Sequence, residues 1–144
     1  MKEEKSAPIA FQIKTIELLD SCLVAPTQQL NTNTVFQFDI NLEHRLNIDN
    51  NLVIVICSVS ILNENKDQLM GQLKSSCIYQ VEKLRDHLDE NSKSLKLPDD
   101  FIITLNSVSI STTRGLMFSL FRGTFLHNAV LPIIDPKSFV KSGS

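Results

Sequence analysis

Residues 36–62 read FQFDINLEHRLNIDNNLVIVICSVSIL, and this stretch decides the fold. Apolar and polar residues alternate strictly from Phe36 to Glu43, and this period of two predicts a β-strand with one apolar face. The polar residues 49–51 predict a tight turn. Residues 52–62 carry apolar side chains on both faces of their first half, which is typical of a central strand covered on both sides. The stretch therefore predicts two antiparallel strands joined by a short turn.

Two further strands are expected to flank this pair. Upstream, Phe11 and Ile13 are followed out of phase by Ile16 and Leu18, and the change of phase predicts a bulge or kink in the first strand. Downstream, the polar residues 63–67 predict a hairpin loop, after which a fourth strand is expected over residues 68–81. Consecutive strands joined by short polar turns predict a four-stranded antiparallel meander.

One long helix is expected after the strands. Pro98, followed by two aspartates, predicts its start, and apolar residues recur at helical spacing until about Phe121. Residues 104–115 are rich in serine and threonine, which form helices weakly, so packing rather than intrinsic propensity should hold this helix. Arg122 would complement the helix dipole, and Gly123 would end the helix in a left-handed conformation. The predicted class is α+β, with the sheet packed against one long helix.

Two segments lie outside these regular elements. The highly charged residues 82–96 predict a solvated turn or a short helix. Pro132 and Pro136 forbid a regular helix near the C-terminus, so residues 126–134 are expected to form an extended connection that crosses the sheet.

The composition limits the class of partner. A formal net charge of −2 and a pI near 5.9, without a basic cluster that contains aromatic residues, argue against nucleic acid. The longest apolar run, Leu52–Cys57, is too short to span a membrane, and the charged N-terminus does not resemble a signal peptide. A cytoplasmic protein with no membrane insertion is therefore expected. Cys22, Cys57 and Cys77 form no CxxC motif, which predicts free, buried or half-buried thiols in a reducing compartment.

The sequence offers no convincing catalytic or metal site. Cys22 and His127 would be a nucleophile and a base in principle, but no third orienting residue or oxyanion loop is recognisable. The three histidines lack the spacing of metal ligands, and the carboxylates of residues 85–90 are more typical of a solvated face than of a Mg²⁺ site. We therefore predict no enzyme, no metal and no cofactor.

Three stretches resemble the SecB family of export chaperones. FQIKTI at residues 11–16, with Ala25-Pro26 behind it, resembles the family's first strand. FQFDINL and the apolar strand after it resemble the second and third strands, and RGTF at residues 122–125 resembles the signature that ends the long helix. The resemblance covers nearly all of residues 9–139. It implies a SecB-like domain at 9–140, while the residues themselves predict a flexible arm at 1–8 and a disordered tail at 141–144.

The resemblance also implies a function. SecB proteins are tetramers, arranged as a dimer of dimers with the helices in the subunit interface. They act as holdases for unfolded or pre-secretory polypeptides, and they use no nucleotide or cofactor. The family's substrate-side positions match Leu69, Gly71, Leu73 and Ser75 on the fourth strand, and Leu126, Val130 and Ile133 on the crossing segment.

Two departures from the family bear on its partners. The family docks onto the translocation motor SecA through acidic positions, of which this chain keeps Asp20 but has Val24 and Gln72 at two others. The resemblance therefore leaves SecA docking open. The chain also ends five residues after Phe139, where the family has a further helix. An alternative function is thus a SecB-fold interaction module dedicated to one partner protein, such as an antitoxin or an assembly factor.

Overall fold

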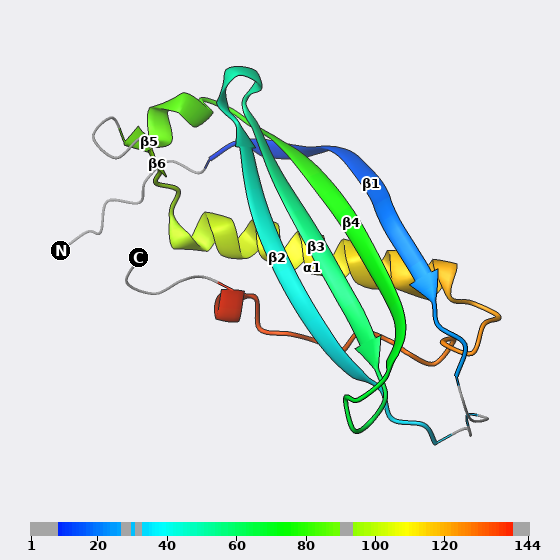
Figure 1. Ribbon diagram of the computed structural model, residues 1–144. Helices are drawn as coiled ribbons and strands as arrows, with labels where there is room; N and C mark the ends of the chain where they lie inside the picture. The colour runs from blue at the N-terminus through cyan, green and yellow to red at the C-terminus, as the bar shows by residue number, and fades with distance from the viewer. Residues whose placement is uncertain (1–8, 27–29, 31–32, 90–93, 140–144) are drawn as a thin grey trace.

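The computed structural model describes residues 9–26, 30, 33–89 and 94–139. The predicted arm at 1–8 and the predicted tail at 141–144 lie outside the described residues. The described part has two layers, a sheet and the elements behind it (Figure 1). Its main elements are strands β1 (Phe11–Leu23), β2 (Gln37–Asn47), β3 (Leu52–Leu62) and β4 (Leu69–Val81), followed by helix α1 (Asp99–Leu120).

Minor elements occupy the connections. Short 3-10 helices form at Ile48–Asn50, Leu84–His87 and Pro136–Phe139, and two small strands, β5 (Leu88–Asp89) and β6 (Ser94–Leu95), pair antiparallel. The charged residues 82–96 thus contain a short 3-10 helix, as predicted, together with the ends of a small hairpin that was not predicted.

The predicted four-stranded antiparallel sheet with one long helix is confirmed, but its order differs from a simple meander. The sheet order is β1-β4-β3-β2, so β2, β3 and β4 form a meander while β1 pairs with β4 at the far edge. This arrangement is a Greek key. The sequence pattern indicates which face a strand presents, but not which strand lies beside it. The long connection between β1 and β2 lets β1 reach the opposite edge.

The phase change predicted in β1 is confirmed. The pairing of β1 with β4 shifts register between Ile13 and Thr15, and a second shift, which was not predicted, lies between Leu18 and Asp20. Because the first shift inserts one extra residue, Ile13 lies on the same face of the sheet as Ile16 and Leu18, and the second shift likewise keeps Leu23 on that face.

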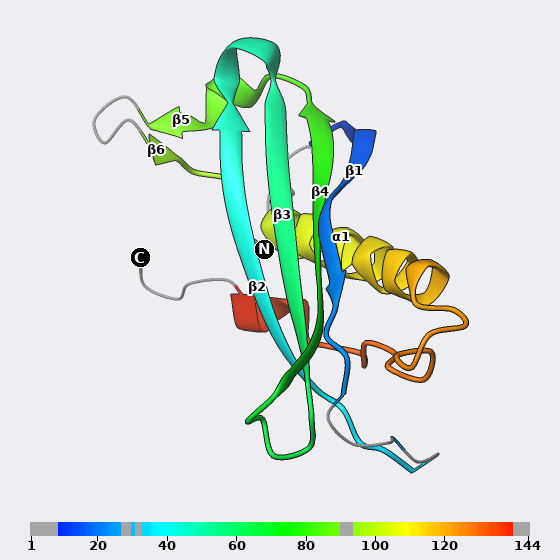
Figure 2. The same cartoon turned by 45° about the vertical axis from the view of Figure 1, so that its right-hand side comes forward.

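The core lies between the sheet and the elements behind it. Alternate residues of β3 that were predicted to share one face are buried, and so are their neighbours on α1 and on the chain after α1, including Ile110, Met117, Leu126 and Leu131. Figures 1 and 2 both place α1 and the chain after it on the same side of the sheet. Each fully buried aliphatic side chain stabilises the fold by about 1.5–3 kcal/mol.

The boundaries of α1 agree with the sequence prediction. The helix starts directly after Pro98 with Asp99 and Asp100 in its first turn, and it ends at Leu120. Gly123 has a φ of +77°, so it adopts the expected left-handed conformation just beyond the helix. In the described part of the chain, no helix is both long and apolar enough to cross a membrane.

Hydrogen bonds join α1 to the sheet as well as apolar contacts. The Tyr79 hydroxyl lies 2.7 Å from the Ser109 hydroxyl, and the Ser75 hydroxyl lies 2.8 Å from that of Thr113. Ser75, Ser109 and Thr113 are fully buried. Two of the weak helix formers, Ser109 and Thr113, therefore face the sheet and are held by tertiary contacts, whereas Thr104, Ser107 and Ser111 are exposed.

Candidate functional site

Large apolar side chains are exposed along one edge of the sheet. Phe11, Ile13, Ile16, Leu18 and Leu23, here called the β1 row, are 37–45% exposed. Their partners on β4 are, in order, Val81, Tyr79, Cys77, Ser75 and Gly71, all of which are buried.

The β1 row lies on the same face of the sheet as α1. Phe11 confirms this placement, because its ring makes an edge-to-face contact with Phe101 of α1 at a centroid distance of 5.1 Å. The C-terminal end of α1, where Phe118 and Leu120 are exposed, projects past β1 (Figure 2). Within the part of the chain that the structure describes, this row is therefore only partly covered at the sheet edge.

A second apolar surface is formed by the chain after α1, between Leu126 and Ile134, here called the crossing segment. Leu126, Ala129 and Leu131 are buried against the core, whereas Val130 is 50% exposed and Ile133 is 95% exposed. The segment contains neither helix nor sheet hydrogen bonding. Its exposed residues therefore stand outward from an irregular backbone that is anchored from beneath.

The structure brings two predicted binding residues, Gly71 and Leu126, into direct contact. A methyl group of Leu126 fills the space that a β-carbon at Gly71 would need. Leu73 and Ser75, further along β4, have no exposed surface, and Leu69 is half-buried. Gly71, Leu73 and Ser75 lie on the face that α1 and the crossing segment cover, whereas Leu69, beyond a register shift, is paired with Leu62 of the opposite face.

The seven predicted polypeptide-binding residues therefore fall into three groups. Val130 and Ile133 are accessible, Leu69 is partly accessible, and Gly71, Leu73, Ser75 and Leu126 are enclosed in the protomer. Binding of polypeptide at these residues stays a prediction.

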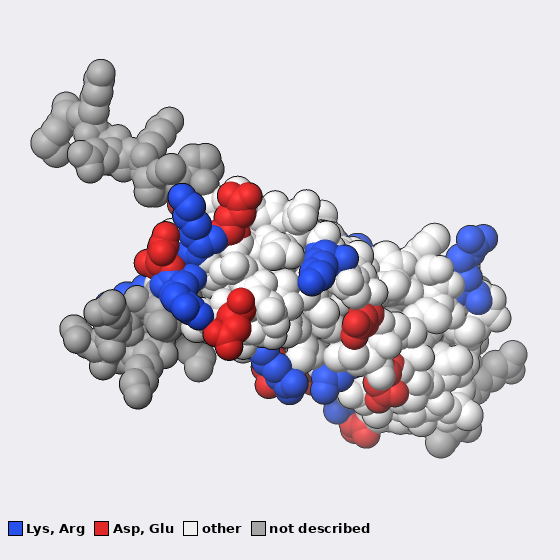
Figure 3. All heavy atoms as spheres, turned by 90° about the horizontal axis from the view of Figure 1, so that it is seen from above, with Lys and Arg blue, Asp and Glu red and all other residues white. Residues whose placement is uncertain are grey.

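Asp20, the predicted SecA-docking residue, is exposed on the face of the sheet opposite α1. It lies across from Lys74 of β4, and Gln72 is paired with Cys22 two residues further along. Val24 is half-buried, and its N–H donates to the carbonyl of Met70. In the view of Figure 3, acidic and basic side chains are interspersed between wide uncharged areas, with no large patch of one sign.

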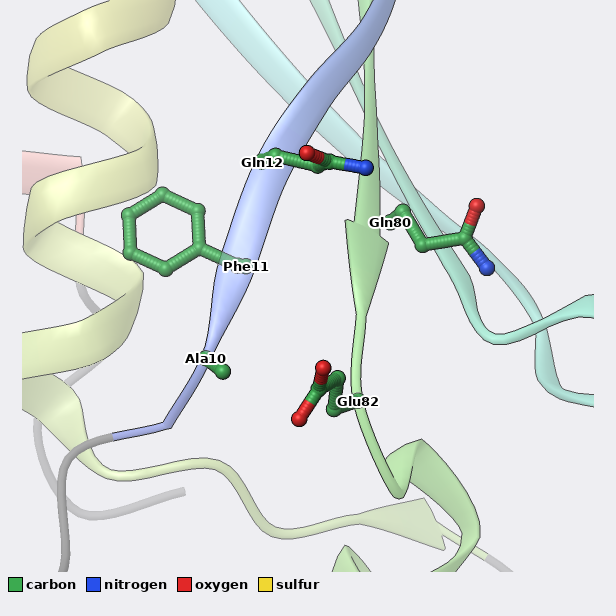
Figure 4. Close-up of a pocket in the computed structure, with 5 residues that line it drawn as sticks. All are labelled: Ala10, Phe11, Gln12, Gln80 and Glu82. Atoms are coloured by element: carbon green, nitrogen blue, oxygen red, sulfur yellow. The ribbon is translucent and has the colours of Figure 1, made fainter.

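A hollow of about 290 Å³ opens beside the start of β1. It is lined by Ala10, Phe11, Gln12, Gln80 and Glu82. In Figure 4 the Phe11 ring points toward α1, away from the Gln80 amide. Cys22 and His127, the nucleophile and base considered from the sequence, are not among the lining residues. Within the described ranges, no three His, Cys, Asp or Glu residues are grouped so as to hold a metal ion.

Burial governs the titration of two groups under α1. It raises the pKa of the Cys57 thiol, although a hydrogen bond with Thr113 opposes the shift. Burial likewise raises the pKa of the Tyr79 phenol. Both groups therefore stay protonated at neutral pH. Cys57 and Cys77 are buried free thiols, as predicted, but Cys22 is exposed because it lies on an edge strand.

Two features of this surface were missed from the sequence. The exposure of the β1 row depends on β1 being an edge strand, which its own alternation does not reveal. Arg114 of α1 donates to the carbonyls of Leu131 and Pro132 in the crossing segment. No local pattern links residues that are 17 and 18 positions apart in this way.

One solved structure decides the fold type. It is the SecB-like chaperone Rv1957 of Mycobacterium tuberculosis, in complex with a ChAD peptide from the Rv1956 HigA1 antitoxin. It matches 86% of this chain and 89% of its own chain, with a TM-score of 0.61 and 11% sequence identity. The fold is SecB-like. The prediction drawn from FQIKTI, FQFDINL and RGTF is thereby confirmed at the level of the fold.

The other comparisons add little to the SecB-like assignment. A protein of unknown function from Streptococcus agalactiae matches 80% of this chain and 90% of its own chain with 10% identity, but its TM-score of 0.39 is too low to indicate a common fold. No protein-family model and no curated protein sequence matches the chain. Because a fold does not determine what its surface binds, partners must be argued from the surface itself.

Proposed function

We propose that this chain is a SecB-like chaperone, a holdase that binds extended apolar segments of unfolded or pre-secretory polypeptides in the cytoplasm. The observation that carries the proposal is the exposed apolar surface of the crossing segment, where Ile133 is 95% exposed and Val130 is 50% exposed. Exposed apolar side chains gathered on a folded domain indicate an interaction surface. Three free thiols support a reducing compartment.

The neighbouring strand supports this surface. Phe36, Phe38, Ile40 and Leu42, at the start of β2 and just before it, are only half-buried, and they pack against the same core cluster as Ile134 of the crossing segment. Among the described residues β2 is an edge strand, so the backbone groups on its outer side have no sheet partner in that part of the chain. An extended client would combine apolar contacts with backbone hydrogen bonds that do not depend on its sequence.

The β1 row supports self-association, in keeping with the dimer of dimers that the SecB resemblance implies. If two copies of β1 pair antiparallel about a two-fold axis at Glu17, Phe11 lies opposite Leu23 of the second copy, and Ile16 lies opposite Leu18. Each of these residues belongs to the β1 row, so the pairing would place both rows on one face of a joined sheet.

Charge favours the same register. The two-fold axis at Glu17 sets Lys14 opposite Asp20 of the second copy, twice in each dimer. These two opposite-charge pairs offset the one like-charge pair of Glu17 with itself. Edge strands that expose apolar residues are prone to such pairing.

A second candidate function is a module dedicated to one partner, such as an antitoxin. The replacement of two acidic docking positions by Val24 and Gln72 favours it, because this change weakens a role in export through SecA. The SecB-like chaperone of Mycobacterium tuberculosis was solved with an antitoxin peptide, which gives this candidate a precedent on the same fold. Affinity purification from the native host separates the candidates, since one stoichiometric partner supports the module and a range of unrelated polypeptides supports the holdase.

Light scattering tests the holdase proposal directly. A chemically unfolded client protein is diluted into buffer with the wild-type chain, or with a variant that carries Val130→Ser and Ile133→Ser. We expect the wild type to suppress aggregation and the variant to suppress it much less. A wild-type chain that stays monomeric in size-exclusion chromatography with light scattering, and leaves aggregation unchanged, would contradict the proposal.

A further inference from the structure

Arg114 of α1 makes two hydrogen bonds to the backbone of the crossing segment. Its Nε donates to the carbonyl of Leu131 at 2.8 Å, and its Nη2 donates to the carbonyl of Pro132 at 2.8 Å. The planar guanidinium has several N–H groups in a fixed fork, which suits two acceptors on consecutive residues. The arginine thus binds the segment at a single place with a defined orientation.

These bonds hold a segment that has little other backbone support. The backbone bonds within it are local, such as those from Ala129 N–H to Leu126 and from Val130 N–H to Asn128. Leu131 is buried and fixes one side of the segment, while Pro132 restricts its own φ and the conformation of the residue before it. The hydrogen bonds from Arg114 fix the carbonyl groups of Leu131 and Pro132.

Ile133 directly follows the two residues whose carbonyls accept hydrogen bonds from Arg114, and almost its whole side chain is exposed to water. A mobile segment would bury such a side chain against nearby apolar surface, because burial of an isoleucine stabilises a protein by about 1.5–3 kcal/mol. Fixing the two preceding carbonyls keeps Ile133 pointing outward. Holding it in a binding-competent position before a client arrives lowers the entropy lost on binding.

We propose that Arg114 is a positioning residue of the polypeptide-binding surface. It clamps the carbonyls of Leu131 and Pro132 so that Val130 and Ile133 are presented to a client. This inference rests on the proposed holdase function, because it assigns to Arg114 the preorganisation of that same surface.

Variants of two arginines test the proposal. Arg114→Met keeps the apolar stem and removes the fork, and Arg114→Lys keeps the charge without the planar donors. Arg122→Met is the matched control, because Arg122 is an exposed arginine just beyond the same helix. The probe is a fluorescein-labelled peptide with leucine at alternate positions, and its affinity is measured by fluorescence anisotropy. Hydrogen exchange reports separately on the amides of the crossing segment.

Loss of the two Arg114 hydrogen bonds should weaken binding of the peptide without unfolding the protein. We expect Arg114→Met to bind the peptide about tenfold more weakly, which corresponds to the cost of ordering one or two side chains on binding. Its amides at Ile133 and Ile134 should exchange faster, while those of β3 stay protected. Arg114→Lys should fall between wild type and Arg114→Met, and Arg122→Met should bind as the wild type does.

A double-variant cycle separates positioning from a general structural role. If Arg114 acts through Val130 and Ile133, adding Arg114→Met to the variant with Val130→Ser and Ile133→Ser should weaken binding no further than that variant alone. Additive losses, or an Arg114→Met variant that binds as tightly as wild type, would overturn the proposal while leaving the holdase function intact. A wild-type chain that does not bind the peptide would overturn the holdase function, and this inference with it.

Discussion

The Tyr79 hydroxyl lies 2.7 Å from the Ser109 hydroxyl and 3.2 Å from the carbonyl of Leu105, so one phenol joins the middle of the sheet to α1 at two points. The ring itself has no exposed surface. This contact concentrates apolar burial, hydrogen bonding and a shifted pKa in one side chain, and it allows stability to be tested as a function of pH.

Stability should fall at alkaline pH. Burial raises the pKa of the Tyr79 phenol and of the Cys57 thiol above their ordinary values of 10.0 and 9.0. Because the unfolded chain releases these protons at lower pH than the folded chain, their contribution is complete below pH 9 and is lost as the pH rises above that value. Because it has no phenol to ionise, Tyr79→Phe should lose less stability than the wild type as the pH rises. At neutral pH its free energy of unfolding should be lower by about 1 kcal/mol, as measured by urea unfolding across the pH range.

Ser109→Ala is the control for this prediction, because it removes one hydrogen bond and keeps the ionisable phenol. It should retain the alkaline loss. Since the chain has a single tyrosine, tyrosinate absorbance follows the ionisation directly. A Tyr79→Phe variant with an unchanged alkaline slope would show that the phenol is not responsible.

Gly71→Ala should destabilise the fold by about 1–3 kcal/mol, because the new methyl group would collide with Leu126 in a filled core. Gly115→Ala is the matched substitution. It lies in α1 with open space around it, and it should stabilise the helix by about 0.5–1 kcal/mol. Urea unfolding measures both values, and equal effects of the two substitutions would contradict the close contact of Gly71 with Leu126.

Reversing charges on β1 should reveal the register of self-association. Lys14→Glu or Asp20→Lys alone places like charges opposite each other in the proposed pairing and should weaken the dimer. Combining the two restores the complementarity and should restore the affinity. Each pair contributes about 0.2–1 kcal/mol, so each single variant should shift the dimer dissociation constant by about 2-fold to 30-fold.

Sedimentation equilibrium can measure this charge swap. Glu17→Gln serves as a further check, since removing the like-charge pair should strengthen the dimer. A double variant that is weaker than either single variant would exclude this register.

One thiol per chain should react quickly with a thiol reagent under native conditions. Cys22 is exposed, whereas Cys57 and Cys77 have no exposed surface. Cys22→Ser should therefore abolish the fast phase and leave two slow thiols that react only as the chain unfolds. Fast labelling of Cys57 or Cys77 in the folded protein would contradict the burial of both beneath α1.

The sequence predicted the elements whose signals are local. The alternation from Phe36 to Glu43, the turn at residues 49–51 and the long apolar strand after it each repeat a regular pattern, and all three agree with the structure. The phase change after Ile13 was likewise visible as a bulge, because a period of two fails at a single residue.

Other features depend on contacts between distant residues and could not be predicted in this way. Nothing near Phe11 indicates that β1 pairs with β4 rather than with β2, because alternation specifies a face and not a neighbour. For the same reason, the sequence could not predict which residues of the candidate site are exposed. Leu73 and Ile133 are both apolar residues in extended chain, and only their packing shows that one is enclosed and the other is in water.

The position of β1 at the edge next to β4 also affects how the chain is made. During synthesis, Phe11–Leu23 emerges first but cannot pair until Val81, 58 residues after Leu23, has been added. At ribosomal rates this delay lasts roughly 3 to 12 s. For that time the nascent strand is itself an unpaired apolar segment, the kind of polypeptide that the finished protein is proposed to hold. Copies already assembled would therefore meet newly translated β1 strands of their own kind as competitors for the same surface.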